Sequence, residues 1–310
     1  DSDSYDGGFS ETTTASFSVD ASIGAIDGDA TSEKTVAAYQ FNIGLSTSFT
    51  GEDSLDIAID SGSDAPAATA DDPLAFDTGA ALSVDGVTYS FPLGGMSMLV
   101  GFDTDISSVF TGACTYSAFT DWMSNCGTDL SNGVAGGGVT VAGSYAFDSG
   151  FSIAAGVSGT SDSSAGLLTK EGDDYYGIEA AYTADSWGVS VAYTSDDNAA
   201  AAETTYWGVN ANYSFDIADV SVGFETEETS GTDQTGYFVG LTFPEVGPGS
   251  VSIAAGTSEN FTDAQTEYMV YEASYSYPVN DGLTITPGVF IEEKAGDDLT
   301  GIMVKSSFSF

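Results

Sequence analysis

The chain contains no histidine and no arginine, and four lysines stand against 47 acidic residues in 310 positions. Histidine is the usual general base and a frequent metal ligand, so its absence argues against Ser-His, Cys-His and histidine-zinc chemistry. A net charge of −43 repels nucleic acid backbones. We therefore expect neither an enzyme nor a nucleic-acid-binding protein. The same charge is equally typical of a solvated surface adapted to salty surroundings. A surface of that kind would also repel nucleic acid, so the two interpretations of the charge are compatible.

Long apolar runs are also missing. No stretch of about 18 apolar residues occurs, which excludes a membrane-spanning helix. Glycine and aromatic residues are abundant instead, with 38 Gly, 16 Tyr and 19 Phe, a composition that suits strands and turns. A β-barrel is the one membrane architecture that escapes such a search, because half of each strand is polar.

The last residues alternate between two faces. Ile302, Val304, Phe308 and Phe310 share one parity, and Lys305 lies on the other. Successive side chains of a strand point to opposite faces, so this pattern is typical of a strand between lipid and water. A final aromatic residue resembles the sorting signal of bacterial outer-membrane barrels. Similar runs predict about sixteen strands, at 13–23, 39–49, 55–59, 87–93, 96–102, 139–147, 151–157, 176–182, 187–193, 207–215, 220–224, 237–243, 251–255, 269–277, 283–291 and 302–310.

Connections between these runs alternate between tight turns and longer polar stretches, as in an outer-membrane barrel. Every second strand ends in an aromatic residue on the lipid parity, which predicts a girdle at the membrane interface. These residues are Phe49, Phe91, Phe147, Tyr182, Phe215, Phe243, Tyr277 and Phe310. We expect an all-β, closed antiparallel transmembrane barrel over residues 11–310 in the bacterial outer membrane, after a linker remnant at residues 1–10.

A sixteen-strand barrel is too wide for its own side chains to fill, so a folded-in loop must narrow it. The best candidate spans residues 103–133, with an apolar middle that would pack against the wall. Its acids would reach the narrowest part. The apolar residues are Phe110, Phe119, Trp122 and Met123, and the acids are Asp103, Asp105, Asp121 and Asp129. The alternative is an outward loop with a small cluster of its own.

The same segment carries both cysteines of the chain, Cys114 and Cys126. We expect a disulfide between them, since an exported protein meets an oxidising compartment and no histidine is present to make a zinc site. Closing so short a ring contributes on the order of 3 kcal/mol in the chain-entropy view, and fixes the shape of a loop.

Carboxylates of the predicted strands fall on the inward parity, because a charge facing lipid costs up to a few kcal/mol. They predict a negative channel that attracts cations and excludes small anions. The acids are Asp20, Asp56, Asp60, Glu179, Glu225, Glu272 and Glu292, and the inward cations are Lys294 and Lys305. The lysines either face the pore or pair with acids on neighbouring strands.

We expect no cofactor. Acidic loop clusters, Asp27 with Asp29 and Asp64 with Asp71 and Asp72, have the oxygen ligands for weak Ca²⁺ binding. None matches a complete calcium-loop spacing, so solvated loop acids are the favoured interpretation.

Five segments carry a family resemblance. They are FSETTTASFSV (9–19), STSFTGEDSLDIAIDSG (46–62), VTYSFPLG (87–94), NCGTDL (125–130) and GGGVTVAGSYAF (136–147). Together they resemble cyanobacterial outer-membrane porins of the carbohydrate-selective (OprB-like) family. The resemblance implies a homotrimer of sixteen-strand barrels that passes small hydrophilic solutes, with the disulfide-bearing third loop at the constriction.

Two departures from that family matter. Its members usually carry an N-terminal surface-layer-homology domain, which this chain lacks, so we expect a barrel-only or trimmed form. They also tend to place basic residues on the third strand, where Asp56 and Asp60 stand here. We therefore expect a passive, cation-preferring porin that also passes neutral solutes. The alternative is a secreted or surface β-rich structural protein without channel activity.

Overall fold

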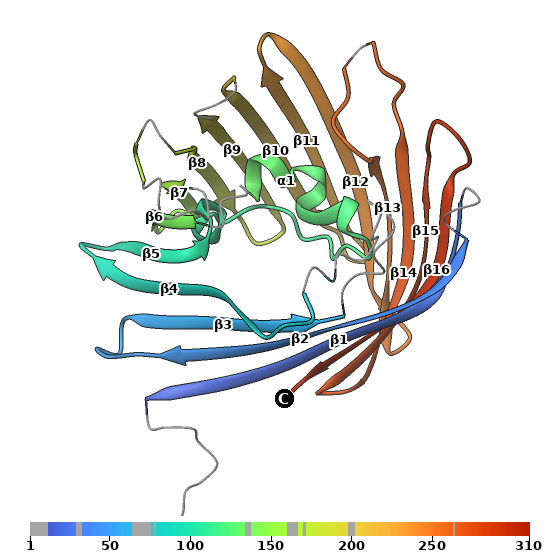
Figure 1. Cartoon of the computed structure of the whole chain (residues 1–310), viewed down its shortest axis with the longest axis horizontal. Helices are drawn as coiled ribbons and strands as arrows, with labels where there is room; N and C mark the ends of the chain where they lie inside the picture. Colours follow the sequence, from blue (N-terminus) through green and yellow to red (C-terminus); the bar gives the residue numbers. More distant parts are fainter. Residues whose placement is uncertain are drawn as a thin grey trace, which may run out of the picture.

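Sixteen antiparallel strands close into a single barrel in the computed structural model, as the alternation predicts (Figure 1). The structure describes residues 12–28, 33–63, 76, 79–133, 138–159, 167–169, 172–197, 202–262 and 264–310, so the predicted linker at 1–10 lies outside it. The strands are β1 Thr13–Asp27, β2 Lys34–Thr47, β3 Ser54–Gly62, β4 Ser83–Leu93, β5 Met96–Thr104, β6 Gly138–Ala146, β7 Phe151–Gly159, β8 Asp174–Thr183, β9 Trp187–Asp197, β10 Thr204–Ser214, β11 Asp219–Thr229, β12 Thr232–Val246, β13 Gly249–Thr257, β14 Met269–Asn280, β15 Leu283–Glu292 and β16 Leu299–Ser309.

The barrel closes where β1 pairs with β16. Val19 lies opposite Phe308 and Ile23 opposite Val304, so the apolar parities of the two strands face the same side. At the end of this seam Phe17 and Phe310 exchange two backbone hydrogen bonds of 3.0 Å, and their rings stack. Closure leaves the sheet without a free edge, which is the condition for a sheet to span a membrane.

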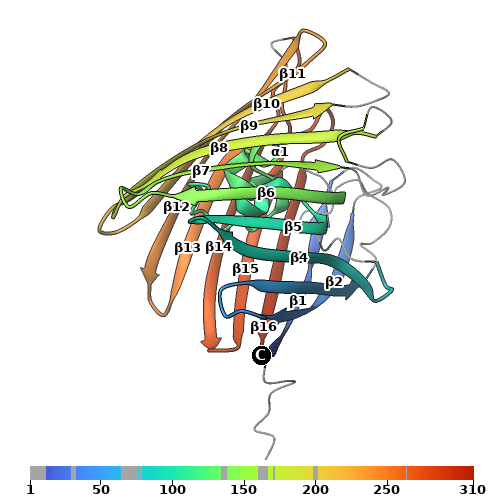
Figure 2. The same cartoon turned by 90° about the vertical axis from the view of Figure 1, so that its left-hand side faces the viewer.

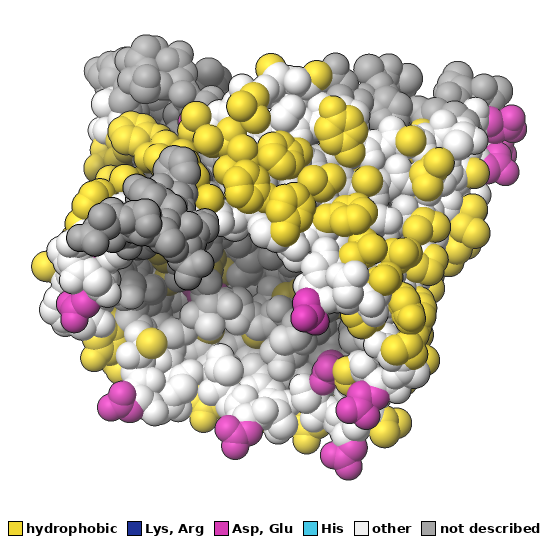
Figure 3. Space-filling model, turned by 90° about the horizontal axis from the view of Figure 1, so that it is seen from below, with side chains coloured by type: hydrophobic (Ala, Val, Ile, Leu, Met, Phe, Trp, Pro, Cys, Tyr) yellow, Lys and Arg dark blue, Asp and Glu magenta, His cyan; other side chains and the backbone are white. Residues whose placement is uncertain are grey.

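Alternation places apolar side chains outside and polar ones inside. On β11 the side chains of Val222 and Phe224 are exposed, whereas Ser221 and Glu225 are buried on the opposite face. The strand direction turns progressively around the wall, so that β6 and β14 cross at a steep angle in Figure 2. In Figure 3 hydrophobic side chains cover much of the visible outer wall, and the hollow beneath them is bordered by acidic side chains.

Several strands are longer than the alternation predicts. β1 continues to Asp27 instead of ending near 23, and β2 begins at Lys34 instead of near 39. These extensions lie at the side of the long connections, and there Ile26 of β1 and Val36 of β2 are buried in an apolar cluster with Phe119 of the connection after β5. Alternation is enforced only where one face meets lipid, so the pattern stops before the hydrogen-bonded ladder does.

The predicted aromatic residues lie at the short-turn ends of the even-numbered strands. Phe49, Phe147, Phe215, Tyr277 and Phe310 are exposed on the outer surface. Second rings stand beside several of them, as in the pairs Tyr145 with Phe147 and Tyr213 with Phe215. This is the arrangement expected of rings at a membrane interface.

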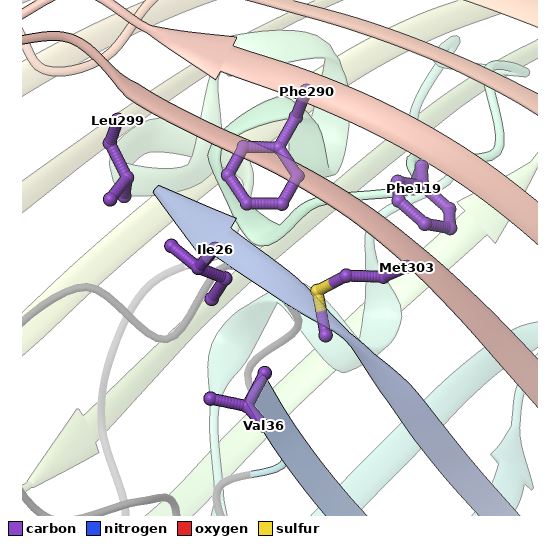
Figure 4. Packing of buried hydrophobic residues seen from close by; sticks show 6 residues of the cluster. All are labelled: Ile26, Val36, Phe119, Phe290, Leu299 and Met303. Atoms are coloured by element: carbon purple, nitrogen blue, oxygen red, sulfur yellow. The ribbon is translucent and has the colours of Figure 1, made fainter. Parts of the chain in front are cut away.

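Three helical turns lie in the connection after β5: η1 Ile106–Val109, η2 Asp121–Gly127 and α1 Asp129–Asn132. No helix in the described part of the chain is long and apolar enough to cross a membrane. The main buried apolar clusters form between this connection and the wall. In one of them Phe119 joins five wall residues: Ile26, Val36, Phe290, Leu299 and Met303 (Figure 4).

Candidate channel constriction

The connection after β5 folds into the barrel instead of projecting from its rim (Figure 1). We call residues 105–133 the constriction loop. Its first helical turn contacts β6, β7 and β8, its second contacts β11 to β13, and α1 contacts β9 and β10. The predicted inward loop is confirmed, and the outward alternative is wrong.

Two wall glutamates accept hydrogen bonds from backbone N–H groups of the constriction loop. Glu179 on β8 receives the N–H of Thr111 at 2.6 Å and that of Gly112 at 2.7 Å, one on each carboxylate oxygen. Glu272 on β14 receives the N–H groups of Phe119 and Thr120, both at 2.8 Å. Both side chains are almost fully buried beneath the loop.

Glu272 also accepts two hydroxyl groups. The Tyr116 hydroxyl lies 2.9 Å from Oε1, and the Thr120 hydroxyl lies 2.6 Å from Oε2. Burial raises the pKa of the Tyr116 phenol, and the neighbouring Glu272 carboxylate raises it further. The raised pKa keeps the phenol protonated, so it donates its hydrogen bond to Glu272.

A third glutamate, Glu225 on β11, holds the end of the constriction loop. Its Oε2 accepts the backbone N–H of Ser131 at 2.7 Å and the Ser131 hydroxyl at 2.6 Å. Its Oε1 accepts the side-chain amide of Asn260 at 3.1 Å. Glu225 is 1% exposed.

Asn210 on β10 is a loop contact that sequence reasoning missed. Its Oδ1 accepts the N–H of Ala113 at 3.0 Å, and its Nδ2 donates to the Thr128 hydroxyl at 2.9 Å. The available signal was an asparagine on the inward parity of a strand. That parity gives a face and not a partner.

The disulfide between Cys114 and Cys126 is present, with the two Cα atoms 5.7 Å apart. It lies within a second apolar cluster with Tyr116, Met123, Phe238 and Val270. The predicted packing of the loop's apolar middle against the wall is confirmed in these clusters for Phe119, Trp122 and Met123.

The four predicted loop acids do not lie together. Asp121 and Asp129 are exposed and line one cavity of about 370 Å³, together with Glu225, Glu227 and Glu259. The last two are acids that the sequence did not single out. Asp105 is half-buried and accepts the Ser107 hydroxyl.

Asp103 belongs to β5 and not to the loop, so its predicted place at the narrowest part stays a prediction. Its backbone has φ of 50°.

Three other predicted wall acids lie on β1 and β3, away from the glutamates that hold the loop. Asp20 accepts the Ser307 hydroxyl, Asp56 accepts the Ser54 hydroxyl at 2.7 Å, and Asp60 accepts the Ser83 hydroxyl at 2.9 Å. Asp60 lines a second cavity of about 340 Å³ that includes Ser18 and Asn42. Their partners are hydroxyls, so their negative charge is not neutralised by these contacts.

The inward lysines differ from each other. Lys294 lies just after β15, and its Nζ is 3.0 Å from the carboxylate of Glu292, the last residue of that same strand. The predicted pairing with an acid on a neighbouring strand stays a prediction. Lys305 lines a third cavity, of about 350 Å³, beneath the constriction loop. Ten serine and threonine residues line the same cavity: Thr115, Ser117, Thr242, Ser250, Ser252, Ser274, Ser276, Thr284, Thr286 and Ser307.

Of the acidic pairs considered for Ca²⁺, only Asp27 is among the described residues. Asp29, Asp64, Asp71 and Asp72 lie outside them. Within the part of the chain that the structure describes, no group of three or more acidic, cysteine or histidine residues is placed to hold a metal ion.

Asp53, in the short turn between β2 and β3, is a second site that the sequence did not reveal. Its Oδ1 accepts the N–H groups of Phe49 and Thr50 at 2.9 and 2.7 Å, and its Oδ2 accepts the Tyr89 hydroxyl at 2.7 Å. The Thr50 hydrogen bond is the main cause that lowers the pKa of Asp53 well below its ordinary value. The carboxylate therefore fixes the shape of this turn.

Comparisons with known proteins agree with this architecture. A family model described as Gram-negative porin matches residues 18–289. A comparison with curated proteins finds no match. Among solved structures, OprB of Pseudomonas putida is similar with a TM-score of 0.75 and 13% identity, over 96% of this chain and 94% of that one.

Two further solved structures are similar. A loop-deletion mutant of OmpT from Vibrio cholerae has a TM-score of 0.68 and 10% identity, over 97% of this chain and 100% of that one. An anion-selective porin from Comamonas acidovorans has a TM-score of 0.66 and 13% identity, over 96% and 99%. At these identities the likeness shows a shared fold.

Proposed function

The chain belongs to the Gram-negative porin family of the bacterial outer membrane, and from this we propose that it is a passive diffusion channel for small hydrophilic solutes and ions. The observation that carries the proposal is the placement of the constriction loop. The loop narrows the barrel from one side and leaves one cavity beside it that is lined by acids and another beneath it that is lined by hydroxyl groups. A barrel of this size is too wide to be filled by its own side chains, so the remaining space holds water.

We further propose that the channel prefers cations. Asp121 and Asp129 stand exposed on the constriction loop, and Asp20 and Asp56 lie half-buried on the wall of β1 and β3. The Debye length is roughly 8 Å at physiological salt, so such carboxylates influence ions in a passage of comparable radius. Stronger brine shortens this range, and the preference should weaken accordingly.

Reconstitution into planar bilayers tests both proposals. The purified protein should give steady ion conductance, and liposomes that contain it should swell in small neutral solutes but not in large ones. Changing Asp121→Asn and Asp129→Asn together should lower the permeability ratio of K⁺ to Cl⁻ while conductance remains. Absence of any conductance would refute the channel proposal. An unchanged permeability ratio would show that these two acids do not determine ion selectivity.

The oligomeric state and the solute class are proposals as well. We propose a homotrimer, and a carbohydrate or another neutral solute as cargo beside cations, in line with the resemblance to cyanobacterial porins. The mass of the detergent-solubilised protein tests the trimer, and swelling rates in a sugar series test the cargo. A monomeric mass would contradict the first, and no swelling in any sugar would contradict the second.

The second candidate is a β-rich surface protein without channel activity. Its supporting observation is the acidity of the chain, with a net charge of −43. Such a protein would leave planar bilayers silent after reconstitution.

A further inference from the structure

The three buried wall glutamates hold three separate points of the constriction loop. Glu179 binds residues 111–112 near its beginning, Glu272 binds residues 119–120 at its middle, and Glu225 binds Ser131 at its end. They stand on β8, β14 and β11, so the anchors are spread along the wall that the loop crosses. The three contacts therefore hold the loop at its beginning, its middle and its end.

Each carboxylate is occupied by donors from the protein. Glu179 and Glu225 are 1% exposed and Glu272 is 4% exposed, so solvent and permeating ions have almost no access to them. Backbone N–H groups inside a protein need acceptors, and an ionised carboxylate is the strongest one that a side chain supplies. The interior thus has two kinds of acid, buried acceptors under the loop and exposed acids beside it.

The inner wall beneath the constriction loop carries glycines at the points where the loop approaches it most closely. A Cβ atom built on Gly223 would lie 1.9 Å from the carbonyl oxygen of Cys126, and one on Gly208 would lie 1.9 Å from the hydroxyl of Ser131. One on Gly240 would lie 2.5 Å from the Tyr116 ring, and one on Gly288 would lie 2.4 Å from the Phe119 ring. The loop therefore rests directly on the backbone of the wall at several strands, and the disulfide stiffens its middle.

From these contacts we infer that Glu179, Glu225 and Glu272 are positioning residues that lock the constriction loop to the wall, so that the constriction is a fixed aperture and these three acids are not part of the ion filter. This inference rests on the proposed channel function. It assigns ion selectivity to the exposed acids and aperture stability to the buried ones.

Amide substitution distinguishes the two roles, because a glutamine side chain has one acceptor oxygen and one donor nitrogen. In Glu179 and Glu272 both oxygens accept backbone N–H groups, so neither orientation of Gln satisfies both. In Glu225 one oxygen faces only the Asn260 amide, which can turn its own oxygen toward the new NH₂ group. Gln should therefore be tolerated best at Glu225.

The experiment is single-channel recording in planar bilayers with Glu272→Gln, Glu179→Gln and Glu225→Gln. The matched control is Glu227→Gln, which removes one carboxylate from β11, the strand that also carries Glu225. Glu227 lines the open cavity, and among the described residues its carboxylate accepts one long hydrogen bond, from Asn260 at 3.5 Å.

We expect Glu272→Gln and Glu179→Gln to replace the single steady level by noisy current with several sublevels. Their K⁺ to Cl⁻ permeability ratio should change little. Glu227→Gln should keep the steady level and lower that ratio, and Glu225→Gln should be close to wild type in noise. Steady currents in all four variants would overturn the inference, and so would a ratio that falls most at Glu272.

A second measurement needs no variant and covers failure of the variants to fold. In the wild-type barrel, hydrogen exchange at the amides of Thr111, Phe119, Thr120 and Ser131 should be as slow as in the strands. Exchange as fast as in the exposed turns would overturn the inference. A silent wild-type protein would refute the channel itself, whereas a conducting one with steady variants refutes only the anchoring role.

Discussion

Replacing Gly223 by alanine tests how closely the constriction loop rests on the wall. The new Cβ would lie 1.9 Å from the Cys126 carbonyl oxygen, 3.0 Å from its carbon and 3.1 Å from Cγ2 of Thr128. An ordinary contact begins near 3.4 Å, so the loop must move about 1.5 Å away from β11. The wall is held by two neighbouring ladders, so the loop moves and not the strand.

This displacement carries the loop toward the centre of the barrel and narrows the passage. Overpacking of this kind costs about 1–3 kcal/mol. We expect Gly223→Ala to show a lower single-channel conductance and to lose its folded gel mobility at a lower temperature than wild type.

The matched control is Gly44→Ala, on the inner face of β2. Its Cβ would approach only the Ser16 hydroxyl, at 2.6 Å, and that side chain can rotate away. The control should keep wild-type conductance and heat resistance. If Gly223→Ala also kept both, the direct contact between loop and wall would be refuted.

Three further predictions concern single groups. Changing Cys114→Ser and Cys126→Ser together removes a constraint of roughly 3 kcal/mol on the unfolded loop, so loop amides should exchange faster while the strands stay protected, and unchanged loop exchange would contradict this. Tyr116→Phe leaves the Glu272 carboxylate without one of its donors, at a cost of about 1–3 kcal/mol; the variant should lose folded gel mobility at a lower temperature, and a variant as heat-resistant as wild type would argue against a structural role for that hydroxyl. The lowered pKa of Asp53 means that its contribution to stability is complete above the ordinary value of 3.8 and is lost as the pH falls through the lower folded value. Protection of the Thr50 amide, measured relative to the intrinsic exchange rate at each pH, should thus stay high at pH 5 and fall only in stronger acid, whereas Asp53→Asn should lack it at both; a loss of wild-type protection near pH 5 would contradict the assignment.

The strand pattern was predictable because lipid imposes it. In β16, Ile302 and Val304 must face hydrocarbon and Lys305 must not, so the sequence itself records the two faces. The inward loop was predictable from its length and from apolar residues such as Phe119. The same physics explains why the ends of β1 and β2 were missed, since no lipid enforces alternation there.

The roles of the inward acids were not predictable from parity. Glu225 and Glu227 share a strand and a face and line the same cavity, yet the first is 1% exposed beneath the loop and the second is half-buried. The difference depends on contacts with residues far away in the chain, such as Ser131, 94 positions from Glu225. Glycine gives no signal of its own for close approach, so Gly223 could not be distinguished from a turn or bulge residue.

The most direct test of the proposed acidic channel is the reversal potential of the wild-type protein across a tenfold KCl gradient. The exposed carboxylates around the passage predict a potential with the sign of K⁺ permeation, which shrinks when both solutions are made more concentrated. A potential near zero, or one with the sign of Cl⁻ permeation, would contradict the account.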